Sequence, residues 1–339
     1  MKFFALPTSF LTVLSLAALL VLMPLVSKAE APVTVAAASL SGSEILPGDR
    51  EPSFEKVLDD QLQPSFILDL PAKDKFVLVA ELEAGKLHVF EKEKGLVLNQ
   101  VKTYQVSIGK QGYNKRVEGD KRTPVGVYRV TSHLTDEQLD DFYGDAAYPL
   151  NYPNVWDRLN QYTGSGIWLH GEPSDKKERP QFDSDGCIVL SNDGITELAQ
   201  YLDVGYTKVV SVPNMEWLSN QQVAEKRVEL TGEIQNWLDA WKPKNHSEYI
   251  SFYSQEFSDT EKNYRQWDRY KKRVNNRKRY IKVAMSDLGL YAYPGQDNMV
   301  MAEFYQHYRS NNYKSIGWKR QLWKKEDDGR WRIIYERGG

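Results

Sequence analysis

The stretch 166–190 constrains the fold most, because it holds the only cysteine of the 339 residues. Residues 166–169 are a short apolar run that predicts a strand ending at His170. A largely polar loop follows, and Gly186 lets the backbone turn tightly just before Cys187. The pattern therefore predicts a β-rich domain in which a strand end and a glycine-cornered turn carry the imidazole and the thiol.

The residue types at this place suit nucleophilic catalysis. A thiol attacks a carbonyl only as the thiolate, so it needs an adjacent base, and we expect His170 to ionise Cys187. Gly186 has no side chain, which lets a substrate carbonyl approach the backbone N–H groups of Gly186 and Cys187, where an oxyanion would form. Each residue taken alone also has a structural interpretation, since a single Cys is commonly a small buried hydrophobic residue.

Taken together, these residues resemble the signature of the L,D-transpeptidase (YkuD-type) catalytic domain. That signature runs His-Gly, a variable loop, then Ser-His-Gly-Cys and a branched apolar residue. Here Asp185 stands where the commonest form has the second His, and Val189 stands where it often has Arg. At these two positions the sequence resembles the subgroup that contains L,D-carboxypeptidases and lipoprotein-releasing amidases more than the main cross-linking enzymes. A Thr-Pro-x-Gly-x-Tyr motif at 123–128 also resembles the family, so the resemblance covers roughly residues 74–213.

The resemblance implies roles for the matching positions. Cys187 would form a thioester, His170 would act as its base, and the backbone carbonyl of Gly171 would accept a hydrogen bond from the second imidazole nitrogen. The implied substrate is the stem peptide of peptidoglycan, cut after the L-centre of its diamino acid with loss of the terminal D-residue. Further candidates for binding the substrate, including its carboxylate, are Lys110, Arg116, Arg122, Tyr152, Ser184 and Asp185.

The first residues predict export. Lys2 gives a basic start, and residues 10–26 are an apolar run. The small residues Ser27 and Ala29 suit cleavage by a signal peptidase after Ala29, so residues 1–29 predict a signal peptide. The protein would then reach the periplasm, where an unpaired thiol is a candidate reactive group. If the segment is retained, it would instead associate the protein with the inner membrane. Residues 30–73 predict a linker and a short helical lead-in.

Between residues 74 and 213 the pattern predicts a mostly β catalytic domain. A polar connection at 136–156 predicts a loop, which either lines a cleft or packs on the surface. Ser191 is expected to cap a short helix after the nucleophile. The predicted strands are 76–81, 86–90, 101–107, 123–130 and 207–212.

Residues 221–337 predict a second domain, in which apolar residues at helical spacing are followed by a strand-rich C-terminal part. Three helices are expected, at 223–241, at about 249–257 and at 260–275, and alternation in the last strands implies a sheet with one buried face. This order resembles an NTF2-like domain, a sheet curved over helices into a cone, so the fold class of the chain is α+β. The predicted strands are 280–285, 289–293, 299–308, 315–324 and 331–336.

The acceptor of the acyl group is left open by the sequence. An amine acceptor would make the enzyme an L,D-transpeptidase, and water would make it an L,D-carboxypeptidase that trims tetrapeptide to tripeptide. The pairing with an NTF2-like module resembles cell-shape-determining L,D-carboxypeptidases, which favours trimming. The alternatives are an amidase that releases wall-attached lipoprotein and a non-catalytic peptidoglycan-binding scaffold.

Composition and spacing argue against other classes of partner. The 44 basic and 46 acidic residues give a net charge of −2, which does not indicate a nucleic-acid partner. One cysteine cannot build a structural zinc site, and no cluster has metal-ligand spacing, so we expect neither a metal nor another cofactor. The histidines His246 and His307 are assigned structural roles.

Overall fold

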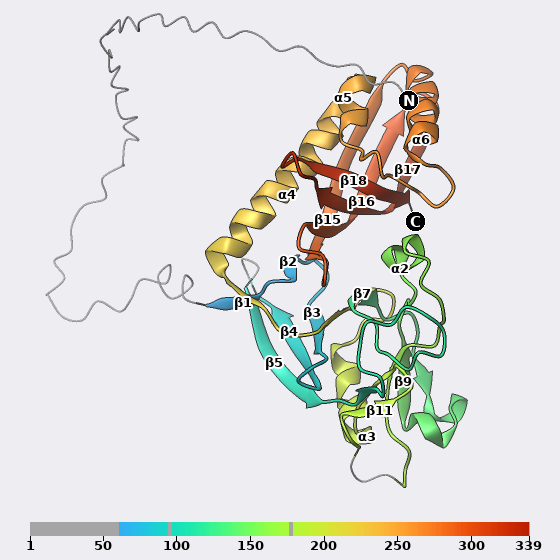
Figure 1. The fold of residues 1–339 in the computed structure, drawn as a ribbon. Helices are drawn as coiled ribbons and strands as arrows, with labels where there is room; N and C mark the ends of the chain where they lie inside the picture. The colour runs from blue at the N-terminus through green and yellow to red at the C-terminus, as the bar shows by residue number, and fades with distance from the viewer. Residues whose placement is uncertain (1–60, 94–96, 176–178, 339) are drawn as a thin grey trace, which may run out of the picture. The chain divides into compact units, whose positions relative to one another are not determined.

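The structure, a computed structural model, describes residues 61–93, 97–175 and 179–338. These residues form a β-rich part followed by helices and a long antiparallel sheet (Figure 1), which confirms the predicted α+β class. The predicted signal peptide and most of the predicted linker lie outside the described residues. No helix among the described residues is long and apolar enough to cross a membrane.

The catalytic part is built on a five-stranded sheet with the order β5-β4-β3-β13-β7. The predicted hairpin of β3 with β4 is confirmed as antiparallel, and β13 lies parallel to β3. The strands of this sheet are β3 (Phe76–Glu81), β4 (Lys86–Lys92), β5 (Leu98–Gln105), β7 (Gly126–Arg129) and β13 (Lys208–Val212).

Strand β3 is buried on both faces, which explains its continuous apolar sequence. Leu78 and Ala80 pack into the core of the catalytic part. Val77 and Val79 point the other way, into a core shared with Tyr291 and neighbouring residues of the C-terminal sheet. Because side chains alternate along a strand, one run of apolar residues joins two cores.

A second, smaller sheet carries the site, with the order β12-β10-β9-β8, and a two-stranded sheet pairs β11 with β6. Helix α3 follows β12, and the predicted cap is confirmed because the Ser191 side chain accepts a hydrogen bond from the Gly194 N–H. These elements are β6 (Ile108–Gly109), β8 (Leu134–Thr135), β9 (Ala146–Pro149), β10 (Trp168–His170), β11 (Phe182–Ser184), β12 (Ile188–Val189), α3 (Asn192–Leu198) and the 3-10 turn η3 (Ala199–Tyr201).

The connection at 136–156 is not a simple loop, which corrects the prediction. It contains two 3-10 turns, η1 (Asp136–Gln138) and η2 (Asp141–Tyr143), then strand β9, and it leads into helix α2 (Val155–Leu159). Strand β9 is antiparallel to β10, with Ala147 opposite His170. Its four residues are too few for alternation to be visible in the sequence, and its pairing partner supplies the stability that the local pattern does not show.

The C-terminal part packs three helices against a sheet with the order β18-β17-β16-β15-β2, in which β2 is Ile67–Asp69. Helix α4 buries residues at helical spacing, including Ile234, Trp237 and Trp241. The bounds are α4 (Asn220–Trp241), α5 (His246–Ser251), α6 (Tyr264–Asn276), β15 (Ile281–Ala292), β16 (Met299–Ser310), β17 (Lys314–Lys325) and β18 (Trp331–Gly338).

Two predictions about this part need correction. The strands predicted at 280–285 and 289–293 are one strand, β15, interrupted by a register shift between Ser286 and Gly289. Asp287 within the shift has φ 52°, a left-handed conformation that breaks the alternation without ending the strand. The second helix is also shorter than expected, because α5 ends at Ser251.

The described end of the predicted linker, residues 61–73, contains strands. Strand β1 (Leu62–Pro64) pairs with β14 (Trp217–Ser219), and β2 (Ile67–Asp69) is added to the C-terminal sheet beside β15. The predicted helical lead-in lies mostly outside the described residues, and Leu62 at its end is in β1. Strands of three residues that pair with partners far away in sequence leave no periodic signal of their own.

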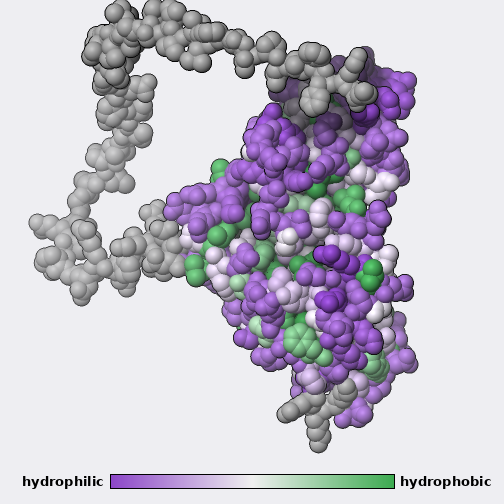
Figure 2. All heavy atoms as spheres, viewed as in Figure 1, coloured by the Kyte–Doolittle hydropathy of each residue, from purple (hydrophilic) through white to green (hydrophobic). Residues whose placement is uncertain are grey.

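The surface is mainly hydrophilic on the face shown in Figure 2, with apolar residues scattered among polar ones. Two exposed apolar side chains, Phe142 and Phe182, belong to the elements around the catalytic strand β10 and its flanking sheet. Scattered exposed apolar side chains are normal for a folded protein and do not by themselves indicate a binding surface.

Candidate active site

The fold brings His170 and Cys187 to one face of the small sheet. His170 ends β10, and the parallel pairing sets Leu169 opposite Ile188 and His170 opposite Val189. Continuing this register by one residue places Cys187 opposite Trp168. Since side chains alternate along both strands, the thiol and the imidazole project from the same face, two positions apart.

The imidazole of His170 is held in one orientation and one tautomer. Its Nδ1 lies 2.6 Å from the carbonyl oxygen of Gly171, which is the contact that the resemblance implies. A proton on Nδ1 leaves Nε2 as the acceptor, the form that a general base requires. Burial lowers the pKa of His170 to about 4, so the ring is neutral near pH 7.

Glycine is required at position 171 by close packing. A Cβ atom there would lie 2.2 Å from Oδ1 of Asn192, at the start of α3. The same oxygen accepts hydrogen bonds from the N–H groups of Asp145 and Glu172, at 3.2 and 3.1 Å. Asn192 therefore fixes the turn whose carbonyl orients His170, and the sequence analysis did not identify it.

The thiol of Cys187 lies beside the backbone of the strand that carries His170, and its ionisation by His170 stays a prediction. It donates a hydrogen bond to the carbonyl oxygen of Gly166, at 3.3 Å. Burial raises the pKa of Cys187 to about 11, while the Trp168 N–H and the charge of Arg179 act in the opposite direction. The raised thiol pKa and the lowered imidazole pKa both favour the neutral forms, so we expect the proton to move as the sulfur attacks a substrate.

The turn before the nucleophile is braced by hydroxyl groups. Ser184 Oγ donates to the carbonyl of Cys187 at 2.6 Å and accepts from the N–H of Gly186 at 3.1 Å. Thr123, from the Thr-Pro motif, donates to the carbonyl of Gly186 at 3.0 Å. The Gly186 N–H, predicted as an oxyanion donor, is thus already engaged by Ser184, and Ser184 shapes the turn rather than presenting its hydroxyl to a substrate.

Aromatic side chains from the 136–156 connection cover the imidazole. The Tyr143 ring lies edge-on to His170, with centroids 5.2 Å apart, and it packs on Trp168 at 4.8 Å. Phe142 lies 6.3 Å from the imidazole and is 54% exposed. Of the two predictions for this connection, lining the site is therefore the one that these contacts favour.

The predicted carboxylate-binding residues are engaged elsewhere. Tyr152 is buried and donates to the carbonyl of Thr163, which makes it a core residue and corrects that prediction. Arg122 donates to the carbonyl of Tyr113 at 2.9 Å. Arg116 lies 5.7 Å over the Tyr162 ring.

Asp185 is largely exposed and points toward cations. Its Oδ1 lies 3.4 Å from Lys110 Nζ and 3.9 Å from Lys121 Nζ, with the Asp185 side chain 66% exposed. Its charge acts to raise the pKa of the Cys187 thiol, but it ranks behind burial among the causes. The carboxylate that could have opposed thiolate formation is therefore paired outside the site.

A cation that the sequence analysis missed lies near the catalytic pair. The Arg179 side chain is 7% exposed, and its charge acts to lower the pKa of both Cys187 and His170. Its Nη2 donates to the carbonyl of Asp183 at 2.8 Å, whereas its buried Nη1 has no hydrogen-bond partner in the described part of the chain. No spacing rule could have identified this residue, because it lies in the polar loop between the two signature segments.

Arg179 also lines a hollow that reaches the catalytic strands. The hollow has a volume of about 420 Å³, and Val189 and Glu172 contribute to its wall. Val189 stands where the related signature often has Arg. Arg179 lines the same hollow as Val189, so its guanidinium lies near the position at which the family's Arg is absent. Among the described residues, no group of three or more His, Cys, Asp or Glu is arranged to hold a metal ion.

Comparison with known proteins identifies both parts of the chain. Residues 75–210 match the L,D-transpeptidase catalytic domain, and residues 229–337 match the Cds6 C-terminal NTF2-like domain. The chain therefore contains a catalytic domain of the L,D-transpeptidase family followed by an NTF2-like domain.

Two solved structures resemble most of the chain, and one curated relative matches a shorter stretch of it. The structure of Bdellovibrio bacteriovorus Bd1075 is 28% identical with a TM-score of 0.71, covering 82% of this chain and 98% of that one. The helical cell shape determining protein Pgp2 from Campylobacter jejuni is 28% identical with a TM-score of 0.67, covering 80% and 96%. The putative L,D-transpeptidase YafK of Escherichia coli K12 is 28% identical over 92 residues, so the match spans only 31% of that relative.

Proposed function

We propose that this protein is a peptidoglycan-modifying cysteine enzyme that cleaves stem peptides through a thioester on Cys187. The proposal rests on the strand register, which when continued by one residue sets Cys187 on the sheet face of His170, and on the Nδ1 contact that orients the imidazole. The likeness of 80% of the chain to a cell shape determining protein supports a role in cell wall biogenesis and cell shape.

The proposed reaction proceeds in two steps. His170 Nε2 takes the thiol proton as the sulfur attacks the amide carbonyl, and the imidazolium then protonates the departing amine of the terminal D-residue. The acyl group remains on Cys187 as a thioester. Water or an amine then attacks the thioester, His170 accepts a proton from this nucleophile, and the thiol is regenerated.

We favour water as the acceptor, which makes the enzyme an L,D-carboxypeptidase. The support is the pairing of this catalytic domain with an NTF2-like domain, which resembles the cell-shape-determining L,D-carboxypeptidases. The test is to incubate the purified protein with muropeptides and measure product masses. Loss of one D-alanine without dimers supports hydrolysis, a new cross-link supports L,D-transpeptidase activity, and release of a bound lipoprotein would support the amidase alternative.

We propose that Arg179 binds the carboxylate of the terminal D-residue. The support is its buried Nη1, which has no hydrogen-bond partner among the described residues, and the effect of its charge on the thiol and the imidazole. Its Nε already pairs with Asp183 Oδ2 at 3.2 Å, so Nη1 is the nitrogen that would bind the substrate. The carboxylate of that residue lies only a few bonds from the amide that is cut, so the cation and the nucleophile must be close. A guanidinium suits this task because it donates in a planar fork.

Replacing Arg179 by glutamine is expected to raise KM for a tetrapeptide by about 10- to 100-fold, because a charge-assisted hydrogen bond is lost. The wild type should discriminate strongly against a tetrapeptide with an amidated C-terminus, and Arg179→Gln should lose this discrimination. Steady-state kinetics with both substrates provide the measurement. Lys110→Gln is the matched control, and a larger rise in KM for that variant would assign the carboxylate to Lys110 instead.

We also propose that the protein is exported to the periplasm, on the sequence pattern of residues 1–29 alone. The expected result is that the protein recovered from the periplasmic fraction begins at Glu30, as read by N-terminal sequencing. A protein that retains Met1 and sediments with the inner membrane would show that the segment is an anchor.

A further inference from the structure

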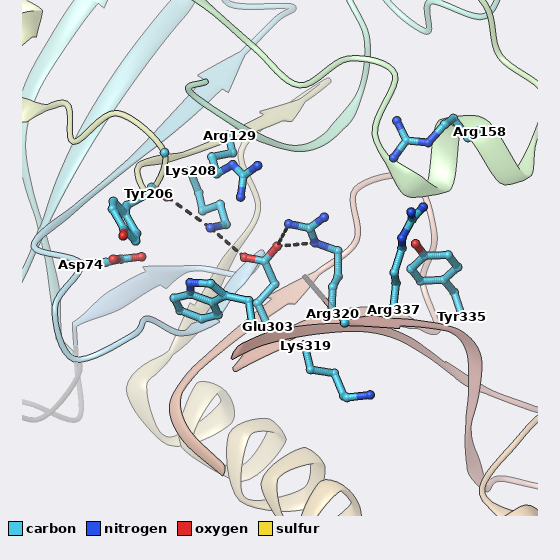
Figure 3. A pocket seen from close by; sticks show the side chains of 13 residues that line it. Asp74, Arg129, Arg158, Tyr206, Lys208, Glu303, Lys319, Arg320, Tyr335 and Arg337 are labelled. Carbon is cyan, nitrogen blue, oxygen red and sulfur yellow. Dashed lines mark hydrogen bonds and ion pairs between the residues drawn. The ribbon is translucent and has the colours of Figure 1, made fainter. Parts of the chain in front are cut away.

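A cavity of about 320 Å³ lies between the catalytic sheet and the C-terminal sheet, apart from the residues around Cys187. Figure 3 shows its side chains, which come from β7, β13 and α2 on one side and from β16, β17 and β18 on the other. Besides Lys319, which is treated below, the cations that line it are Arg129, Arg158, Lys208, Arg320 and Arg337. The carboxylates in its wall are only Asp74 and Glu303.

The strand registers place these cations in like-charged pairs. Lys208 is directly opposite Arg129 in the catalytic sheet, and Arg320 is directly opposite Arg337 in the C-terminal sheet. Like charges opposite one another destabilise a sheet. Two such pairs around one cavity therefore need an anion to compensate them.

Glu303 compensates only part of this charge. Its Oε2 lies 2.8 Å from Lys208 Nζ, and its other oxygen accepts hydrogen bonds from Arg320 (Figure 3). Burial acts to raise the pKa of Glu303, but Lys208 and Arg320 lower it to about 2. This carboxylate is therefore charged at all ordinary pH values. Glu303 thus links the two sheets and shows how the cavity binds a carboxylate.

Three guanidinium groups remain without a carboxylate partner in the described cavity wall. Arg129 has a buried Nε with no hydrogen-bond partner among the described residues. Arg158 and Arg337 are exposed, and the charges of both act to lower the pKa of Tyr335, which also lines the cavity. Burial raises the pKa of Asp74, while Lys208 and Lys73 act to lower it.

Lys319 does not belong to this set, although it borders the cavity. It points away from the other cations in Figure 3, and its Nζ lies 2.7 Å from Glu336 Oε1 on the other face of β17. Successive residues of a strand face opposite sides, so Arg320 reaches the cavity while Lys319 reaches the interior of the C-terminal part.

We propose that this cavity binds a small anion with two or more carboxylate or phosphate groups. Guanidinium groups bind both kinds of oxyanion in a planar fork, and the volume fits a small molecule. Tyr206 and Trp318 supply an aromatic wall beside the charges. Because the anion contacts both sheets, its binding stabilises their packing, and this proposal does not depend on the reaction at Cys187.

Titration calorimetry and thermal unfolding of the full chain carrying Cys187→Ala provide the test. The ligands are citrate as the polycarboxylate and pyrophosphate as the polyphosphate, with acetate at equal ionic strength as the reference. Citrate or pyrophosphate should bind and raise the unfolding temperature. Arg337→Gln and the exposed α2 variant Arg158→Gln should each weaken binding by about tenfold, the loss of one charged hydrogen bond. Arg309→Gln, at an exposed position of β16, is the matched control.

Binding of citrate alone would identify carboxylates as the ligand class, and binding of pyrophosphate alone would identify phosphates. Either result supports the site if the two cavity variants weaken it and Arg309→Gln does not. The proposal is overturned if neither anion binds more tightly than acetate. It is also overturned if Arg309→Gln weakens binding as much as the cavity variants, because the effect would then be a general one of net charge.

Discussion

Replacing Cys187 by alanine is expected to lower kcat/KM for release of the terminal D-residue by at least about 10⁴-fold, because removal of a nucleophile eliminates the covalent route. His170→Ala should cause a loss of similar size, since the two side chains act in one proton transfer and their effects are not additive. Both variants should keep the wild-type unfolding midpoint within a narrow range. Product masses from stem tetrapeptides measure the reaction, and thermal unfolding checks the fold.

The pH dependence separates this mechanism from one with a resting thiolate–imidazolium pair. With the pKa of His170 lowered to about 4, the general base is neutral across the ordinary range, so kcat/KM should fall only as the pH approaches that value. A resting ion pair would instead give a thiol that is alkylated well below pH 8. Slow alkylation of Cys187 at pH 7 that His170→Ala does not slow further is the expected result.

A catalytically normal Cys187→Ala would show that the thiol is not the nucleophile. A wild-type protein that releases no D-residue from stem peptides would instead favour the non-catalytic scaffold. Asp185→Asn is the control within the same turn. Its carboxylate is exposed and paired with lysines, so its removal should change kcat/KM by only a few-fold. A loss for Asp185→Asn as large as for Cys187→Ala would indicate a direct role of Asp185 in the reaction.

The parts of the fold that could be predicted from sequence are those whose signal is local. The helix α4 repeats apolar residues at helical spacing, and β3 and β4 are apolar runs joined by a turn. Strand β2 escaped detection because its three residues are stabilised by β15, which lies far away in the sequence. Strand β9 escaped for the same reason, since its pairing with β10 is invisible in its own composition.

The site divides along the same line. His170 and Gly171 are adjacent in sequence, so their hydrogen bond is a local property of one turn. Arg179 has no fixed spacing to either signature segment, and only the folded loop places its charge near the thiol. The protonation state of Cys187 depends on burial by elements from several parts of the chain, which a motif does not encode.

The largest effect on stability is expected from Glu336→Gln in the C-terminal part. The Glu336 carboxylate is 2% exposed and lies 2.7 Å from Lys319 Nζ and 3.6 Å from Lys271 Nζ. Its second oxygen accepts hydrogen bonds from Tyr253 and Gln321, both at 2.9 Å. Removing its charge leaves two buried ammonium groups uncompensated, which should cost about 3 to 5 kcal/mol in the free energy of unfolding.

The pH dependence of stability should change with this substitution. Burial acts to raise the pKa of Glu336, but Lys319 and Lys271 hold it at about 2, below its ordinary value of 4.5. A carboxylate with a lowered pKa contributes stability that is complete above the unfolded pKa and is lost as the pH falls through the folded one. Wild-type stability should therefore decline between about pH 4.5 and 2, and Glu336→Gln should lack this contribution.

A double variant distinguishes charge imbalance from lost packing. Lys319→Met in the Glu336→Gln background removes one of the two uncompensated ammonium groups, so it should recover part of the lost stability. Burial lowers the pKa of Lys271 to about 8 even with Glu336 present, and loss of the Glu336 charge lowers it further. The single variant should therefore regain stability as the pH rises and this ammonium group loses its proton, starting below the pKa that Lys271 has in the wild type. Urea unfolding of the wild type and the three variants at several pH values, with Lys319→Met alone completing the cycle, measures these terms. If Glu336→Gln unfolds at the wild-type urea concentration, the buried carboxylate is not what keeps Lys271 and Lys319 in the interior.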